Sequence, residues 1–264
     1  MKTHKLFRYF LQTVGLLSLL MLVACTASPA ALSVTDALAS DVTNVDENGN
    51  TTIDQTALSN AFDQIAIEPL SSTEIEGILY MREEEKLARD VYLTLYQQWE
   101  LPIFQNIADS EATHMEAIKN LIDRYGLEDP AMGQDIGVFV NPTLQGLYDQ
   151  LVAEGSKSLG DALRVGAAIE EIDILDLEEA MAQTNKADIQ LVYQNLMKGS
   201  RNHLRSFTST LEKQTGEIYQ PQYLDPVAYE EIISTPRETG GSGQKQGDGQ
   251  GQGQSQSGRR GQRG

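Results

Sequence analysis

The sequence predicts an all-α fold, a four-helix bundle with one long crossover that is flanked by disordered tails. Between residues 71 and 216, apolar side chains recur every three or four positions, and no strand-like alternation extends over a useful length. Residues 126–141 contain one proline and three glycines, which favours a long connection over a helix. Hydrophobic residues make up 40% of the chain, which is sufficient for a core.

The first two helices have recognisable ends. Ser71 and Glu74 form a capping-box pattern, which predicts a helix that begins there and runs to about Trp99. The second helix is expected over about 104–125, because Gly126 is the residue type that most easily adopts the left-handed conformation at a helix end. The Leu-Pro pair between the two helices separates them.

Three further helices are expected after the crossover. A short one spans about 143–154, and the third long helix spans about 159–176 or continues to Gln183. Asn185 is expected to cap the fourth long helix, which reaches about Lys213. Two hairpin-like pairs joined by one long crossover match a ferritin-like bundle, and a looser all-helical array without internal pairing is the competing fold.

The N-terminal residues 1–24 are predicted to be a signal peptide. A basic start precedes an apolar run that is too short to span a membrane. Leu22-Val23-Ala24-Cys25 resembles the lipobox of bacterial lipoproteins, which implies lipidation of Cys25 and anchoring to a membrane on the extracytoplasmic side of the cell envelope. The alternative is an ordinary secretory signal with an incidental cysteine.

Residues 25–70 are predicted to be a polar spacer between this anchor and the bundle, which occupies 71–216. Within the spacer, Asp46 to Asp54 has oxygen ligands at alternate positions, as in a calcium loop. Thr51 stands where such a loop needs glycine, and Ala57 stands where it needs a closing glutamate. A short acidic turn is therefore the preferred interpretation.

Residues 217–264 form a C-terminal extension that is rich in Gly and Gln, and they are expected to be disordered from about residue 240. A solvated tail is the simpler interpretation. Because the last residues include three arginines, a weak contact with an anionic polymer or lipid is the alternative.

Charge and cysteine content exclude two classes of function. Residues 1–25 and 237–264 each carry a net charge of +3, so the formal −18 of the whole chain leaves −24 for the rest. A central region this acidic argues against binding of nucleic acid. A single Cys excludes an intramolecular disulfide and a zinc site built from cysteines.

Acidic and histidine side chains occupy positions where the helical pattern expects apolar residues. Buried carboxylates are costly unless a charge or hydrogen bonds compensate them, so such positions indicate a metal site. A shell of carboxylates and imidazoles could hold two divalent ions, with iron the first choice and manganese or zinc as alternatives. The candidate ligands are Glu85, Glu111, His114, Glu170, Asp173 and His203.

Each candidate also has a structural interpretation. Glu85 could form an ion pair with Arg82, Arg89 or Arg205, and Glu170 with Asp173 could lie on a solvated acidic face. His203 alone could be a core histidine. Tyr92 is expected to be a packing residue.

These residues resemble two known groups over roughly residues 72–215. Glu85-Lys86-Leu87-Ala88-Arg89, Glu111-x-x-His114 and Glu170-Glu171-Ile172-Asp173 look like the metal-binding helices of rubrerythrin-type di-iron proteins. Glu84 to Tyr92, together with Gly199 to His203, resembles an uncharacterised family of prokaryotic ferritin-like domains.

The resemblance implies that Glu85, Glu111, His114, Glu170 and His203 are ligands and that Asp173 replaces a glutamate. Ser200 stands where the fourth helix would carry another glutamate, and the four-cysteine rubredoxin module is missing.

Three functions are compatible with this sequence. The first is an envelope-anchored di-iron oxidoreductase that reduces peroxide or oxidises ferrous iron. The second is a non-catalytic metal-binding lipoprotein, which the missing glutamate favours. The third is a structural or interaction lipoprotein with a decayed site. Each of the three admits a homo-oligomer.

Overall fold

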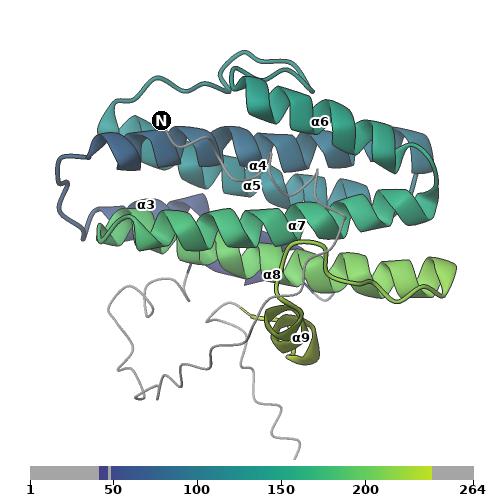
Figure 1. The fold of residues 1–264 in the computed structure, drawn as a ribbon. Coiled ribbons are helices and arrows are strands. Elements are labelled where there is room, and N and C mark those ends of the chain that lie inside the picture. Colours follow the sequence, from purple (N-terminus) through teal and green to yellow (C-terminus); the bar gives the residue numbers. More distant parts are fainter. Residues whose placement is uncertain (1–41, 47–48, 240–264) are drawn as a thin grey trace, which may run out of the picture.

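The computed structural model describes residues 42–46 and 49–239, and over these residues the chain is mostly helical (Figure 1). The elements in chain order are β1 (Thr43–Val45), β2 (Thr51–Ile53), α3 (Gln55–Phe62), α4 (Ser72–Trp99), α5 (Pro102–Tyr125), α6 (Pro142–Gly155), α7 (Leu159–Ala182), α8 (Ala187–Thr215) and α9 (Pro226–Ser234). The predicted all-α class is confirmed for this part of the chain, apart from one small hairpin. Cys25 and the tail from residue 240 lie outside the described residues.

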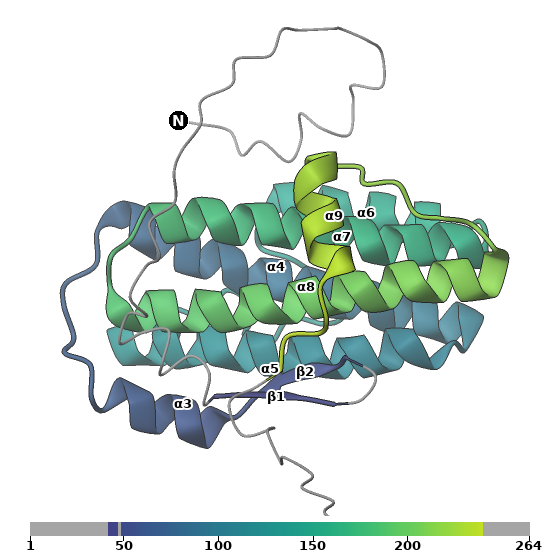
Figure 2. The same cartoon turned by 90° about the horizontal axis from the view of Figure 1, so that it is seen from below.

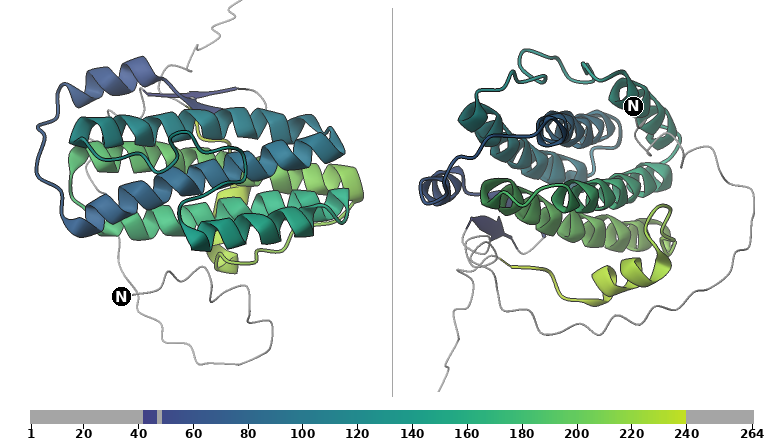
Figure 3. Two further views of the ribbon diagram at one scale, coloured as in Figure 1. Left: turned by 90° about the horizontal axis from the view of Figure 1, so that it is seen from above. Right: turned by 60° about the vertical axis from the view of Figure 1, so that its left-hand side comes forward.

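Four long helices lie side by side, with α4 and α5 above α7 and α8 in Figure 1. The contacts between α4 and α5 and between α7 and α8 are the most extensive, and α4 also packs against α7 and α5 against α8. Helix α6 lies against α4 and α7 (Figure 3). The faces between the helices are filled by Leu, Ile, Val and aromatic side chains that are almost fully buried. No helix in the described ranges is long and apolar enough to cross a membrane.

The predicted helix ends agree with the structure with one exception. The Ser71 hydroxyl accepts the Glu74 amide and the Glu74 carboxylate accepts the Ser71 amide, which completes the expected capping box. Gly126 ends α5 at a φ of 64°. The expected cap at Asn185 is wrong, because α8 begins after Lys186 and no side chain accepts a hydrogen bond at its N-cap.

The described part of the predicted spacer is folded onto the bundle. β1 and β2 pair antiparallel and lie against α5 and α8, and α3 packs against α5 (Figure 2). Val42, Ile53, Leu58 and Phe62 are buried in the core. Strands of three residues are too short to reveal their alternation in the sequence, which explains why a spacer was predicted here.

The acidic segment of this hairpin forms local hydrogen bonds. The Asp46 carboxylate accepts hydrogen bonds from the main-chain and side-chain nitrogens of Asn50, at 2.9 and 2.7 Å. The Asp54 carboxylate accepts the amides of Thr56 and Ala57 and thereby caps α3. These contacts are those of a turn and a helix cap, in agreement with the preferred interpretation of this segment as an acidic turn.

One turn of α4 binds the crossover loop through buried charges. Lys86, which is 1% exposed, forms an ion pair with Asp90 and donates to the main-chain oxygen of Asp135 at 2.8 Å. Asp90 in turn accepts the amide of Gly137 at 2.9 Å. The Lys86 ammonium also lies 4.5 Å from the centre of the Phe139 ring.

Two further residues of the same turn bind the loop at its ends. Arg82 forms an ion pair with Asp129 at 2.9 Å near the beginning of the loop. Glu83 accepts the amides of Val140 and Asn141, at 2.6 and 3.0 Å, where the loop joins α6. The crossover is thus attached to α4 along its whole length.

The described part of the C-terminal extension is also attached to the bundle. The Glu171 carboxylate accepts the Tyr219 hydroxyl at 2.5 Å and the amides of residues 222–224. Glu238 forms ion pairs with Arg201 and Arg205 of α8. Helix α9 therefore lies across α8 (Figure 2).

Replacement of Asp90 by alanine should leave the buried ammonium of Lys86 without its carboxylate partner. We expect Asp90→Ala to lower the free energy of unfolding by about 3–5 kcal/mol, measured by urea denaturation with circular dichroism. Glu154→Ala removes one carboxylate of the exposed Lys157–Glu154 pair and should change it by about 0.5 kcal/mol or less. Equal effects of the two substitutions would contradict this account of the loop.

Candidate metal centre

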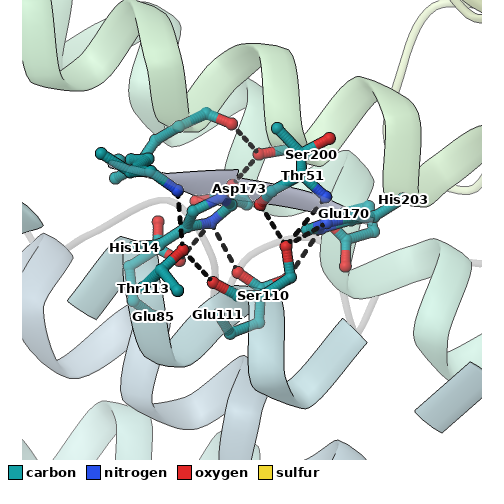
Figure 4. Close-up of polar contacts among 12 residues, drawn as sticks. Thr51, Glu85, Ser110, Glu111, Thr113, His114, Glu170, Asp173, Ser200 and His203 are labelled. Carbon is teal, nitrogen blue, oxygen red and sulfur yellow. Dashed lines mark hydrogen bonds and ion pairs between the residues drawn. The ribbon is translucent and has the colours of Figure 1, made fainter. Parts of the chain in front are cut away.

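Five of the six predicted ligands come together in the interior of the bundle (Figure 4). Glu85 comes from α4, Glu170 from α7 and His203 from α8, while Glu111 and His114 lie one turn apart on α5. All five are at most 2% exposed. The three-residue spacing on α5 places both of its ligands on one face of the helix, as the sequence predicted.

The five side chains form two groups that share Glu111. In the first group, Nδ1 of His114 lies 2.7 Å from Oε2 of Glu111 and 3.3 Å from Oε2 of Glu85. In the second group, Nδ1 of His203 lies 2.8 Å from Oε1 of Glu111 and 3.5 Å from Oε2 of Glu170. Within each group the donor atoms all lie within 4.8 Å of one another.

Glu111 presents one oxygen to each histidine. The two imidazole rings are stacked, with their centres 5.5 Å apart and their planes at 22°. Each ring therefore turns its Nδ1 toward a different oxygen of the same carboxylate. Glu111 thus lies between the two histidines and contacts both.

Several of these atoms lack a hydrogen-bond partner, although they are buried. Oε1 of Glu85 and Nε2 of His114 have none among the described residues. Oε1 of Glu111 and Nδ1 of His203 are close together but are not aligned as donor and acceptor. Unpaired buried polar atoms destabilise the fold. A cation in each of the two groups would satisfy the carboxylate oxygens and the Nδ1 atom. The residues present therefore could hold metal.

Burial and neighbouring charges shift the pKa values in this centre in opposite directions. Burial raises the pKa of Glu85 to about 8, against the opposing effect of His114. Burial also acts to raise the pKa of Glu111, but the imidazoliums of His203 and His114 outweigh it and hold that pKa well below its ordinary value. Without metal, the shared carboxylate is thus the ionised one.

The histidine pKa values are raised by the acids around them. Burial acts to lower the pKa of His203, but Glu111 and Glu170 outweigh it and raise it to about 9. The pKa of His114 is raised well above its ordinary value by Glu111 and Glu85, again against burial. Without metal, both imidazoles are therefore protonated at neutral pH.

Two hydroxyl-bearing side chains, which belong to neither ligand set, orient the ligands. The Tyr92 hydroxyl donates to Oε1 of Glu170 at 2.5 Å, and its ring packs against Phe207. Ser110 Oγ lies 2.9 Å from Nε2 of His203. Such outer hydrogen bonds hold a ligand in the orientation that metal binding needs. Packing was the predicted role of Tyr92, and its hydrogen bond to Glu170 had no signal in the sequence.

The N-terminal hairpin completes the surroundings of His203. The amide of Thr51 in β2 donates to Ser110 Oγ at 3.1 Å, and that hydroxyl also contacts the main-chain oxygen of Thr51. Sequence analysis missed both residues, because the spacing of the helical residues carries no information about a strand packed on them.

Asp173 is the predicted ligand that the structure does not bring into either group. Its Oδ2 accepts a hydrogen bond from the Ser200 hydroxyl, one turn before His203 on α8. Its Oδ1 has no partner among the described residues, and the side chain is 7% exposed. Ser200, which stands where a glutamate was expected, thus holds Asp173 beside the centre.

The structure does not support the ion pairs considered for Glu85. Arg82 binds Asp129, Arg89 binds Asp90 and Arg205 binds Glu238. Glu170 and Asp173 are buried and do not lie on a solvated face. The acids of the centre are therefore left without basic partners other than its two histidines among the described residues.

Gly199 provides the space for His114. A Cβ atom at position 199 would lie 2.4 Å from Cε1 and 2.6 Å from Nε2 of the His114 ring. Both distances are far below normal van der Waals contact. The glycine thus lets α8 approach the imidazole closely enough to close the centre on that side.

The fold and site define an all-α protein with a buried carboxylate–histidine cluster that could hold metal. More particularly, the chain belongs to the family described as an uncharacterized protein domain, DUF2202, whose model matches residues 74–236. That range contains all five clustered ligands and excludes the N-terminal hairpin.

An archaeal protein is similar to most of this domain. The uncharacterized protein MJ0754 of Methanocaldococcus jannaschii is 55% identical over 173 residues, which cover 66% of this chain and 93% of the relative. The crystal structure of the hypothetical protein MJ0754 from Methanococcus jannaschii matches with a TM-score of 0.64 at 54% identity, over 66% of this chain and 99% of that one.

Metal binding should become tighter as the pH rises, because the ligands must lose protons to coordinate a cation. Glu85 and His203 are both protonated at pH 6, and they lose their protons as the pH rises through their pKa values of about 8 and about 9. We expect the Kd for Mn²⁺ to rise at least about 10-fold from pH 8 to pH 6, measured by calorimetry. An affinity independent of pH over this range would contradict the assignment of these ligands.

Proposed function

We propose that this protein is a ferritin-like metalloprotein that binds two divalent cations, with Glu111 bridging them. Glu85 and His114 complete the ligand set of one ion, and Glu170 and His203 complete that of the other. The proposed bundle consists of the pairs α4–α5 and α7–α8 joined by the crossover. The observation that carries the proposal is the shared position of Glu111, whose two oxygens face two different imidazoles at 2.7 and 2.8 Å.

The donor set favours iron or manganese, with zinc as an alternative. Three carboxylates and two imidazoles suit borderline divalent ions, whereas calcium and magnesium prefer sites made of oxygen alone. Three negative carboxylates against two divalent cations leave the centre near neutrality once the histidines have lost their protons. This compensation accounts for acids that the metal-free bundle leaves unpaired.

We propose an oxidoreductase function, the reduction of peroxide or the oxidation of ferrous iron. A pair of ferrous ions would together supply the two electrons that reduction of one peroxide molecule requires. The chain itself would hold the ions in a buried site, because its five ligands are at most 2% exposed. Tyr92 keeps Glu170 in position through its hydroxyl, and Ser110 fixes the ring of His203.

A non-catalytic metal binder is the second candidate, and one observation favours it. Ser200 offers a neutral hydroxyl where a further carboxylate would complete a symmetric centre, and it holds Asp173 outside both groups. One half of the centre would then bind its ion more weakly than the other.

Replacement of the bridging carboxylate tests the metal centre. Protein purified without chelator should contain about two transition-metal ions per chain by elemental analysis. Glu111→Gln should bind at least about 100-fold more weakly at both positions, because each position loses a ligand. Glu116→Gln, a neighbouring and exposed acid on α5, is the matched control and should keep the full metal content.

Peroxide consumption by the iron-loaded protein separates the two candidates. With a chemical reductant added to return the iron to the ferrous state, an oxidoreductase should consume peroxide repeatedly in the wild type and in Glu116→Gln but not in Glu111→Gln. Two tightly bound ions without consumption of peroxide or oxidation of added ferrous iron would leave the non-catalytic binder. Full metal content in Glu111→Gln would overturn the centre itself.

We also propose that the protein is tethered to a membrane of the cell envelope through lipid on Cys25. The support is the lipobox-like sequence and the position of the single cysteine within it. Mass spectrometry of protein expressed in a bacterium with lipoprotein processing should find a chain that begins at residue 25 and carries a diacylglycerol group. A secreted Cys25→Ser variant with an unlipidated N-terminus is the expected control, and an unmodified wild type would exclude the tether.

A further inference from the structure

A narrow pocket lies beside the centre, between α4, α6 and α7. Glu84, Glu85, Glu111, Glu170 and Asp173 supply its polar lining, and the remaining lining is apolar and includes residues of α6. No lysine, arginine or histidine lines it. Three of these acids belong to the proposed centre, whereas Glu84 and Asp173 do not.

Glu84 is buried without a basic partner. Glu84 directly precedes Glu85 in the sequence. Its side chain lines the pocket on the side of α7, and the residue is 4% exposed. No basic or amide donor among the described residues reaches either of its oxygens. Its neighbours in the pocket region are acids: the carboxyl group of Asp176 shares a hydrogen bond with it, and the charges of Asp173 and Asp176 act on it.

Asp173 also has a carboxylate oxygen without a hydrogen-bond donor. Ser200 donates to its Oδ2, but Oδ1 has no donor among the described residues and the residue is also more than nine-tenths buried. Two buried carboxyl groups that line one pocket with unpartnered oxygens are costly as charged groups unless a proton or a cation neutralises them. The described residues place no basic side chain in the pocket, so a bound cation there would replace the protons.

We propose that Glu84 and Asp173 form a third cation site, through which divalent ions reach the two-ion centre. The inference rests on the proposed function, since the pocket continues from these two residues to Glu85, Glu111 and Glu170. Glu84 and Asp173 would bind the arriving ion after it has lost most of its hydration water, because the pocket admits roughly one water molecule.

The size and lining of the pocket suit a site through which divalent ions pass. Its free volume is about 10 Å³, which admits roughly one water molecule. A hydrated ion is larger, so it must exchange water for carboxylate oxygens as it enters. Leu147 and Leu151 of α6 contribute to its apolar lining, which leaves the carboxylates as the ligands in the pocket.

Binding and loading of Mn²⁺ alone test this site. Electron paramagnetic resonance counts the bound ions at equilibrium, and stopped-flow mixing measures how fast free Mn²⁺ disappears. The variant Glu84→Gln/Asp173→Asn keeps the shapes of both side chains. The control Glu76→Gln/Glu178→Gln removes two exposed acids from the same two helices.

The wild type should bind two Mn²⁺ tightly and a third at least about 10-fold more weakly, since that ion has fewer protein ligands. The pocket variant should lose the third ion, keep the other two within about threefold in affinity, and load at least about 10-fold more slowly. The surface control should match the wild type in count and rate. A pocket variant that loads at the wild-type rate, or keeps three ions, would overturn the proposal.

The outcomes also separate this inference from the proposed centre. A wild type that binds no Mn²⁺ refutes both, whereas two tightly bound ions with an unchanged loading rate in the pocket variant refute the third site alone. Since Asn at 173 also alters the contact with Ser200, Glu84→Gln by itself is the second variant. It leaves the hydrogen bond between Ser200 and Asp173 in place, so it should fold with unchanged circular dichroism and still load more slowly.

Discussion

The burial of several carboxyl groups in one bundle is the electrostatic constraint on which the rest of the site depends. Glu85, Glu111 and Glu170 converge there, with His114 and His203 as the basic groups that the described structure sets against them. Isolated buried charges destabilise a fold by several kcal/mol each, so such a cluster persists only with compensation. In the metal-free protein, protons supply it, as the raised pKa values of Glu85 and both histidines indicate.

The surrounding elements hold the side chains of this cluster in position. The hairpin lies outside the range matched by the family model, yet its Thr51 fixes the serine that contacts His203. Gly199 lets α8 approach His114, and Tyr92 binds Glu170. Orientation of the ligands therefore depends on strands, helices and small residues that are far apart in the chain.

Helical spacing was sufficient to predict the four long helices and the convergence of Glu111, His114 and His203, because inward positions repeat regularly along a helix. It could not predict that Ser200 draws Asp173 away, since that contact depends on how α7 and α8 are placed against each other. Periodicity also failed for strands of three residues. The buried role of Glu84 was missed because adjacent acids look alike in a sequence.

The attachment of the crossover to α4 has a consequence for how the protein opens. Arg82, Glu83 and Lys86 hold the loop, and Glu84 and Glu85 on the same turn face the pocket and the centre. Release of the loop would free the very segment of helix that carries a ligand. In the proposed centre, a bound ion would stabilise this turn of α4, so the rate at which a protease cuts the crossover would report on occupancy of the centre.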